Sequence, residues 1–235
     1  MADPRYMHVI QKDINEKMRA ILLDWLVDVH LKFKLLPETL FLTVNIIDRY
    51  LQLISIPRQK LQLIGITAML IACKYEEIYV PEINDFVYVT DKAYSNAEVL
   101  EMEGSILSTL EFNLTTVSPL RFLERYAIIC NFDEKCLTMA KYLLEISLIE
   151  YKMICYPPSM LACSSIYLVN KLIKKTSNWN IPLIKNTKYN ENNLNLCSKD
   201  IFHLLQNGER SNLQAVRRKF SSPKFLEVVK IMEKK

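Results

Sequence analysis

The sequence predicts an all-α fold, and three observations support this. Half of the 235 residues are hydrophobic, and only three are glycine, a residue that sheet proteins need at many of their tight turns. The apolar residues are mainly Leu, Ile and Met in runs of helical length, such as Leu61 to Cys73. The pattern of the first half also returns in the second. We therefore expect helices throughout.

Prolines and capping residues predict where the helices begin. Asp13, with Glu16 three residues later, predicts the cap of a first helix that ends before Pro37. Pro37 begins a second helix and Pro57 a third, because proline is favoured in the first helical turn. A short fourth helix is expected from Pro81, and a fifth, capped by Ser95, is expected to end near Leu110.

The helical pattern begins again at Ser118 and Pro119, displaced by 97 residues. Matching pairs at this offset include small, acidic and basic residues: Gly65 with Ala162, Thr67 with Ser164, Ala68 with Ser165, Asp48 with Glu145, and Lys74 with Lys171. Apolar positions alone would match by chance in so hydrophobic a chain, whereas these residue classes would not. The offset indicates an internal duplication of about a hundred residues.

The match ends after Lys174. An Asn- and Lys-rich segment at about 174–193 has no helical period and predicts a surface loop. Helices are expected again at about 192–206, 212–220 and 223–232. Two repeats of five helices follow from this pattern.

The sequence favours binding over catalysis. Glycines occur only at positions 65, 104 and 208, too far apart to build a phosphate-binding loop. The six cysteines form no C-x-x-C pair, so we expect neither a metal site nor a disulfide framework. Glu76 and Glu77 are adjacent and point about 100° apart on a helix, which does not suit acid-base catalysis. We expect no cofactor.

Charge and hydropathy bear on the partners. The net charge is +4, with the positive excess after Glu209, where it is spread along helical turns rather than bunched. A solvated last helix explains this better than a nucleic-acid surface, although a basic tail could also touch nucleic acid or an acidic partner. The run from Leu61 to Cys73 is too short to cross a bilayer, so no membrane contact is expected.

Several strings resemble the cyclin box. They are MRAILLDWL from Met18, KYEE from Lys74 and FVYVTD from Phe86, and they are most similar to A/B-type mitotic cyclins, in particular to B-type. The five positions that define the first box in that family are present here as Arg19, Asp48, Leu63, Lys74 and Glu103. The resemblance implies an N-terminal segment at 1–17 and two tandem five-helix cyclin-box repeats, at 18–115 and 116–235.

The resemblance also implies a structural salt bridge between Arg19 and Asp48 and a surface that binds a kinase. The residues matching that surface are Ile71, Lys74, Tyr75, Glu103, Leu107, Phe112 and Leu114. The residues alone leave another interpretation open, in which Lys74 and Glu103 snorkel or pair with one another for structural reasons.

A second implied surface is a shallow groove that binds substrates or inhibitors carrying an Arg-x-Leu motif. Its residues would be Met18, Ile21, Leu22, Trp25, Asp28, Arg58, Leu61 and Gln62. Asp28 would face the arginine of the motif, where A-type members tend to have the longer Glu. Periodicity alone instead places the helix residues, including Trp25, in the core.

The function implied by the resemblance is that of a non-catalytic, activating subunit of a cyclin-dependent serine/threonine protein kinase in the cell cycle, located in the nucleus and cytoplasm. An alternative is a transcription-related cyclin-fold protein that binds DNA or the polymerase machinery. That alternative predicts a broad basic face on the repeats, whereas the basic excess here lies near the end of the chain.

Overall fold

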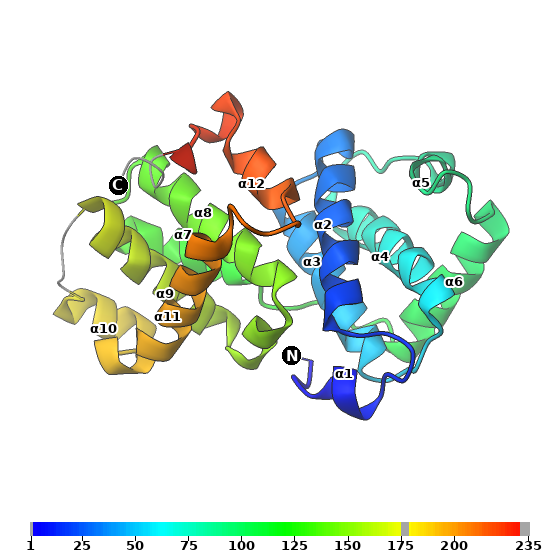
Figure 1. The fold of residues 1–235 in the computed structure, drawn as a ribbon, viewed down its shortest axis with the longest axis horizontal. Helices are drawn as coiled ribbons and strands as arrows, with labels where there is room; N and C mark the ends of the chain where they lie inside the picture. The colour runs from blue at the N-terminus through cyan, green and yellow to red at the C-terminus, as the bar shows by residue number, and fades with distance from the viewer. Residues whose placement is uncertain (1, 175–178, 231–235) are drawn as a thin grey trace. The chain divides into compact units, whose positions relative to one another are not determined.

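The computed structural model describes residues 2–174 and 179–230, and this part of the chain consists of helices and their connections without strands (Figure 1). The all-α prediction is confirmed. The chain divides into two compact units, with the boundary between Thr116 and Val117.

The first unit is built around one central helix. Its helices are α1 (Tyr6–Val9), α2 (Glu16–Phe33), α3 (Pro37–Leu51), α4 (Leu61–Glu76), α5 (Ile83–Val89) and α6 (Asn96–Thr109), with a 3-10 turn at Arg58–Lys60. Helix α4 contacts α2, α3, α5 and α6, and apart from Gln62 its residues from Leu61 to Cys73 are buried. Its apolar character on every side follows from this central position.

The second unit repeats the order. Its helices are α7 (Pro119–Ile129), α8 (Glu134–Ile149), α9 (Pro158–Val169), α10 (Ile181–Thr187), α11 (Glu191–Asn207) and α12 (Ala215–Phe220). Helix α9 contacts α7, α8 and α11, as α4 contacts its own neighbours. Helices α2–α6 and α7–α11 are the two predicted five-helix repeats, and the tandem arrangement is confirmed.

Two sequence predictions about helices were wrong. The cap of α2 is Asn15, whose side chain accepts from Met18 N at 3.0 Å. Asp13 does not cap the helix, because its carboxylate binds the backbone and guanidinium of Arg58. The predicted helix after Pro223 is a 3-10 turn at Pro223–Phe225, and the end of the predicted range, 231–232, lies outside the described residues.

The predicted loop at about 174–193 contains α10. Trp179 and Leu183 are buried there, and Trp179 Nε1 donates to the Tyr189 carbonyl at 2.8 Å. Asn180 caps the helix through Leu183 N. Because this helix has only seven residues and few of them are apolar, the surrounding Asn and Lys residues hide its hydrophobic periodicity. Residues 175–178 of that range are outside the described part.

Candidate protein-binding surfaces

A buried ion pair joins α2 to α3. Arg19 Nε donates to Asp48 Oδ1 at 2.7 Å, and Arg19 Nη2 donates to Asp48 Oδ2 at 2.8 Å. Burial alone would lower the pKa of Arg19, but attraction to and hydrogen bonding with Asp48 outweigh it and raise that pKa. Tyr6, which sequence analysis did not single out, donates its hydroxyl to Asp48 Oδ1 at 2.9 Å. The cluster thus fixes α1 and the start of α2.

Lys74 and Glu103 form an ion pair between α4 and α6. Lys74 Nζ donates to the two Glu103 carboxylate oxygens at 2.6 and 2.8 Å. The pairing that the residues alone allowed is therefore present. The Lys74 side chain is nevertheless 49% exposed, while that of Glu103 is 12% exposed. A partner can reach the ammonium group from solvent.

Apolar side chains of the predicted kinase surface differ in exposure. Phe112 is 70% exposed and Tyr75 is half exposed, with its hydroxyl 2.9 Å from Thr115 Oγ1. Leu107 and Leu114 are partly exposed, whereas Ile71 is buried. Ile71 can therefore support this surface from below but cannot contact a partner in this conformation.

Two further exposed apolar residues, Ile78 and Tyr79, follow α4 and were not predicted as site residues. Both side chains lie almost fully in solvent. Glu77 holds this segment against the start of α3, since its carboxylate accepts from Leu36 N at 2.7 Å. Large apolar side chains held in solvent beside Tyr75 indicate a protein-binding surface. The sequence signal that could have predicted this surface is the run of apolar residues that follows α4.

Four of the five predicted groove residues on α2 are at least partly exposed. Ile21 is 51% exposed, and Met18 and Trp25 are partly exposed, while Asp28 is exposed one turn further along the helix. The core of the unit is instead contacted by Leu23, Leu26 and Val29, all of which are buried. Periodicity alone suggested that Trp25 lies in the core, but the structure leaves its side chain partly exposed rather than fully buried.

The other predicted groove residues are Leu22 on α2 and three residues from the start of α4 and the turn before it. Leu22 and Leu61 are buried and Gln62 is partly exposed. Arg58 is exposed, and its guanidinium binds Asp13 Oδ1 at 2.6 and 2.8 Å. Hydrogen bonds from Arg58 lower the pKa of the Asp13 carboxyl.

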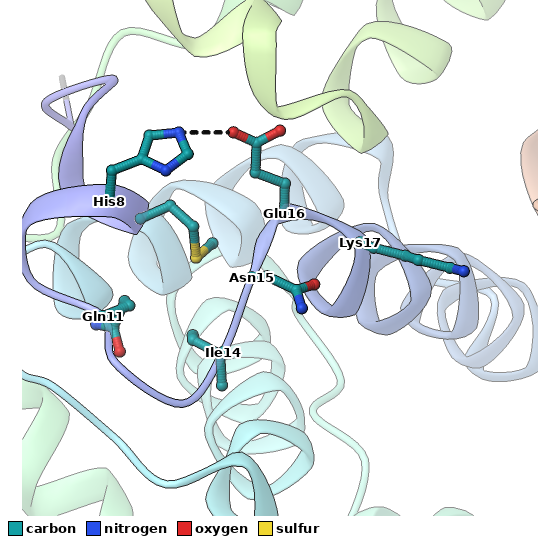
Figure 2. Close-up of a pocket in the computed structure, with 7 residues that line it drawn as sticks. His8, Gln11, Ile14, Asn15, Glu16 and Lys17 are labelled. Carbon is teal, nitrogen blue, oxygen red and sulfur yellow. Dashed lines mark ion pairs between the residues drawn. The ribbon is translucent and has the colours of Figure 1, made fainter.

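A pocket of about 590 Å³ opens between α1 and the start of α2 (Figure 2). His8 and Glu16 face one another across it, with His8 Nε2 3.0 Å from Glu16 Oε1, and Lys17 points away. Gln11 in its wall already donates its side-chain amide to the Leu51 and Ile54 carbonyls. The lining residues contain no cysteine nucleophile and no pair of carboxylates, so we assign the pocket no reaction.

The rest of the described chain offers no metal site and no spanning helix. In residues 2–174 and 179–230, no three His, Cys, Asp or Glu side chains gather as a metal ion would require. None of the helices described there combines the length and apolar character needed to cross a membrane. The six cysteines are free thiols, and burial raises the pKa of Cys73 and of Cys163 to about 12.

Known proteins are similar to this chain in sequence. The chain is 47% identical over 222 residues to G2/mitotic-specific cyclin-B of Dictyostelium discoideum, a match covering 94% of this chain and 51% of that protein. It is 46% identical over 220 residues to Cyclin-B2-1 of Arabidopsis thaliana, with the same two coverages. The chain spans about half the length of the curated relatives it matches.

Solved structures share the fold. A viral cyclin from herpesvirus saimiri superposes with a TM-score of 0.74 at 20% identity, over 84% of this chain and 88% of that one. A chain of the yeast RNA Pol II CTD kinase CTDK-1 complex gives 0.73 at 15% identity, over 89% and 73%.

Family models agree with the predicted resemblance. The model described as cyclin, N-terminal domain, matches residues 1–115, and the model described as cyclin, C-terminal domain, matches residues 117–234. With both domains matched in order along nearly the whole sequence, the chain belongs to the cyclin family.

Proposed function

We propose that this chain is the activating subunit of a cyclin-dependent serine/threonine protein kinase of the cell cycle, acting in the nucleus and cytoplasm. The observation that carries the proposal is the half-exposed ion pair of Lys74 with Glu103, beside the exposed apolar side chains Tyr75 and Phe112. The similarity to cyclins named as G2/mitotic-specific supports the cell-cycle role. No specific observation favours the alternative of a DNA- or polymerase-binding protein.

The surface would act by selecting a conformation of its partner. Lys74 can donate to a backbone carbonyl of the kinase's regulatory helix, while Tyr75 and Phe112 are covered by apolar kinase side chains. With the helix held inward, the kinase can form its own Lys-Glu ion pair and open its activation segment. Raising the population of the active kinase conformer from about 1% to 99% requires the cyclin chain to bind that conformer roughly 5.5 kcal/mol more tightly than the inactive one. The cyclin chain contributes no reacting atom.

We expect the wild-type chain to raise phosphate transfer by a monomeric cyclin-dependent kinase, and the Lys74→Ala, Glu103→Ala double variant to lose about 30-fold or more of that activation, the scale of an interface hot spot. The measurement is the initial rate of transfer from ATP to a histone-like protein, with cyclin at saturating and sub-saturating concentrations. Circular dichroism checks that the variant is folded.

The matched control is Lys152→Ala with Asp200→Ala. This pair also joins a lysine to an acid, at 2.8 Å and with side chains 62% and 18% exposed, but it lies in the second unit. It should activate as the wild type does. Wild-type chain that activates no such kinase would contradict the proposal, while equal activation by the two double variants would show that the Lys74 surface is not the contact.

The groove on α2 would recruit substrates rather than activate the kinase. An extended Arg-x-Leu segment can place its leucine on Ile21 and Trp25 and its arginine near Asp28, one turn further along the helix. The exposed acid and the partly exposed apolar face together match a motif that has one cation and one apolar side chain.

Trp25→Ala should lower kcat/KM about tenfold for substrates that carry the motif and leave kcat/KM unchanged for a short peptide without it. The reason is that the indole is partly exposed on α2, whereas Lys74 and Glu103 of the kinase surface lie on α4 and α6. Steady-state kinetics on both substrates provide the measurement. A similar loss on the two substrates would mean that Trp25 serves the fold.

A further inference from the structure

Helix α4 has a notch where it passes α2. A Cβ atom placed on Gly65 would lie 2.7 Å from Leu22 Cδ1, 3.1 Å from Cδ2 and 3.2 Å from Cγ. All three atoms belong to one side chain, so Leu22 occupies the space that a side chain at position 65 would need. Leu22 is 6% exposed, while its neighbour Ile21 is 51% exposed.

The backbone does not require glycine at this position. Gly65 lies within α4, and no glycine of the chain has a positive φ. Glycine in a helix interior is less favourable than alanine. Its presence in the most buried helix of the unit is therefore explained by the space it leaves and not by its own conformation.

The second repeat has no such notch. The residue 97 positions after Gly65 is Ala162, in the corresponding central helix α9. The residue 97 positions after Leu22 is Pro119, where α7 begins, so the turns of α2 that contain Met18 and Ile21 have no helical counterpart. The second bundle therefore packs with Ala162 at the position that corresponds to Gly65. The notch accompanies the extra turns of α2, which also contain the apolar groove residues.

We propose that Gly65 is a positioning residue for the docking groove: it lets Leu22 sink between α2 and α4, so that the groove is deep enough for the leucine of an Arg-x-Leu peptide. This inference rests on the docking role proposed above. A methyl group at position 65 would displace the flexible end of Leu22 away from α4 and into the space that the peptide leucine needs.

Gly65→Ala should weaken binding of a fluorescent Arg-x-Leu peptide by at least about tenfold, because one methylene gained or lost in an apolar pocket changes binding about 10- to 200-fold. Fluorescence anisotropy with the whole chain measures the dissociation constant. Kinase activation toward a short peptide without the motif should stay at the wild-type level, since Gly65 lies nine residues before Lys74 on α4, about 13 Å along the helix.

The control is Gly104→Ala, on α6. A Cβ atom there has no neighbour within 4 Å, so this variant makes the same helix-favouring change without steric overlap, and peptide affinity should not change. A second readout is the Leu22→Ala background, in which the overlapping atoms are gone. There, Gly65→Ala should no longer alter peptide affinity, although Leu22→Ala itself lowers it.

The outcomes are separable. If the wild type does not bind the peptide, the docking role fails and the role of Gly65 fails with it. If the wild type binds and folded Gly65→Ala binds equally well, the docking role stands and the inference about Gly65 is overturned. If Gly65→Ala does not fold, Leu22→Phe provides a second test. The larger side chain at position 22 would fill part of the groove while Gly65 is unchanged. Undiminished peptide affinity in that variant would likewise overturn the inference.

Discussion

Arg19→Leu should lower the free energy of unfolding by about 3–5 kcal/mol, the cost of leaving one partner of a buried ion pair without its counter-charge. Asp48 would keep its hydrogen bond from Tyr6 but lose both guanidinium contacts while only 6% exposed. Urea denaturation followed by circular dichroism gives the midpoint and slope. An unchanged slope with a lower midpoint assigns the loss to stability.

Arg58→Leu is a control with the same chemistry. Its pair with Asp13 has a closest N to O distance of 2.6 Å, against 2.7 Å for Arg19 with Asp48, but its side chains are 62% and 39% exposed. Solvent screens such a pair, so the midpoint should stay close to that of the wild type. Replacing Arg19 and Asp48 together by leucine should cost less than Arg19→Leu alone. Equal losses from Arg19→Leu and Arg58→Leu would contradict the argument from burial.

Lys219→Met should destabilise the second unit by about 3–5 kcal/mol for the same reason. Lys219 Nζ donates to both Glu145 carboxylate oxygens at 2.7 Å, and the two side chains are almost fully buried. The ammonium also lies over the rings of Phe220 and Phe225, at 5.4 and 5.5 Å from their centres. Methionine keeps the length of the lysine stem and removes the charge.

This loss should depend on pH. Burial raises the pKa of Glu145 above its ordinary 4.5, although attraction to Lys219 and Lys141 opposes the shift. Without Lys219 the folded-state pKa rises further. Below pH 4.5 the Glu145 carboxyl is protonated in both the folded and the unfolded chain, so it adds little to the loss of stability. As the pH rises from 4.5 through the folded-state pKa, the unfolded chain ionises more readily than the folded one, and the loss of stability grows. The difference between wild type and variant should therefore be smaller at pH 4.5 than at pH 8, measured by urea denaturation at both.

Lys230→Met tests whether burial is the cause. Its pair with Glu227 has the same residue types and a 2.6 Å contact in the same unit, but the side chains are 52% and 44% exposed. Stability should hardly change at either pH. A pH-independent loss in Lys219→Met would show that missing packing, and not the isolated carboxylate, is the cause.

The sequence revealed the first ion pair more readily than the second. Arg19 and Asp48 lie at positions that the family resemblance singles out, and the offset of 97 identified Glu145 as the match of Asp48. The match of Arg19 is Thr116, so the cation of the second pair could not be read from the repeat. Lys219 comes from α12, 74 residues after Glu145. Nothing local marks a lysine in a basic segment as buried.

The candidate surfaces show the same limit. Periodicity identified the apolar residues of α2 but could not decide which face of the helix is covered, because Leu22 and Trp25 belong to neighbouring parts of one stripe. Lys74 and Glu103 were found as charges within apolar runs, and only the exposure of their side chains in the structure separates a reachable pair from an enclosed one. Tyr6 was missed because its partner Asp48 is 42 residues away, and α10 was missed because its few buried apolar residues show no helical period.

We expect the distant origin of Lys219 to affect how the nascent chain folds on the ribosome. The first bundle has both members of its buried pair within 29 residues of each other, and its whole unit ends at Thr116. In the second bundle, 74 more residues must be translated after Glu145 before Lys219 is made, which takes about 4 to 15 s at ordinary elongation rates. During that interval Glu145 lacks its counter-ion, so the half-made bundle is the stage at which chaperone binding or misfolding has its opportunity.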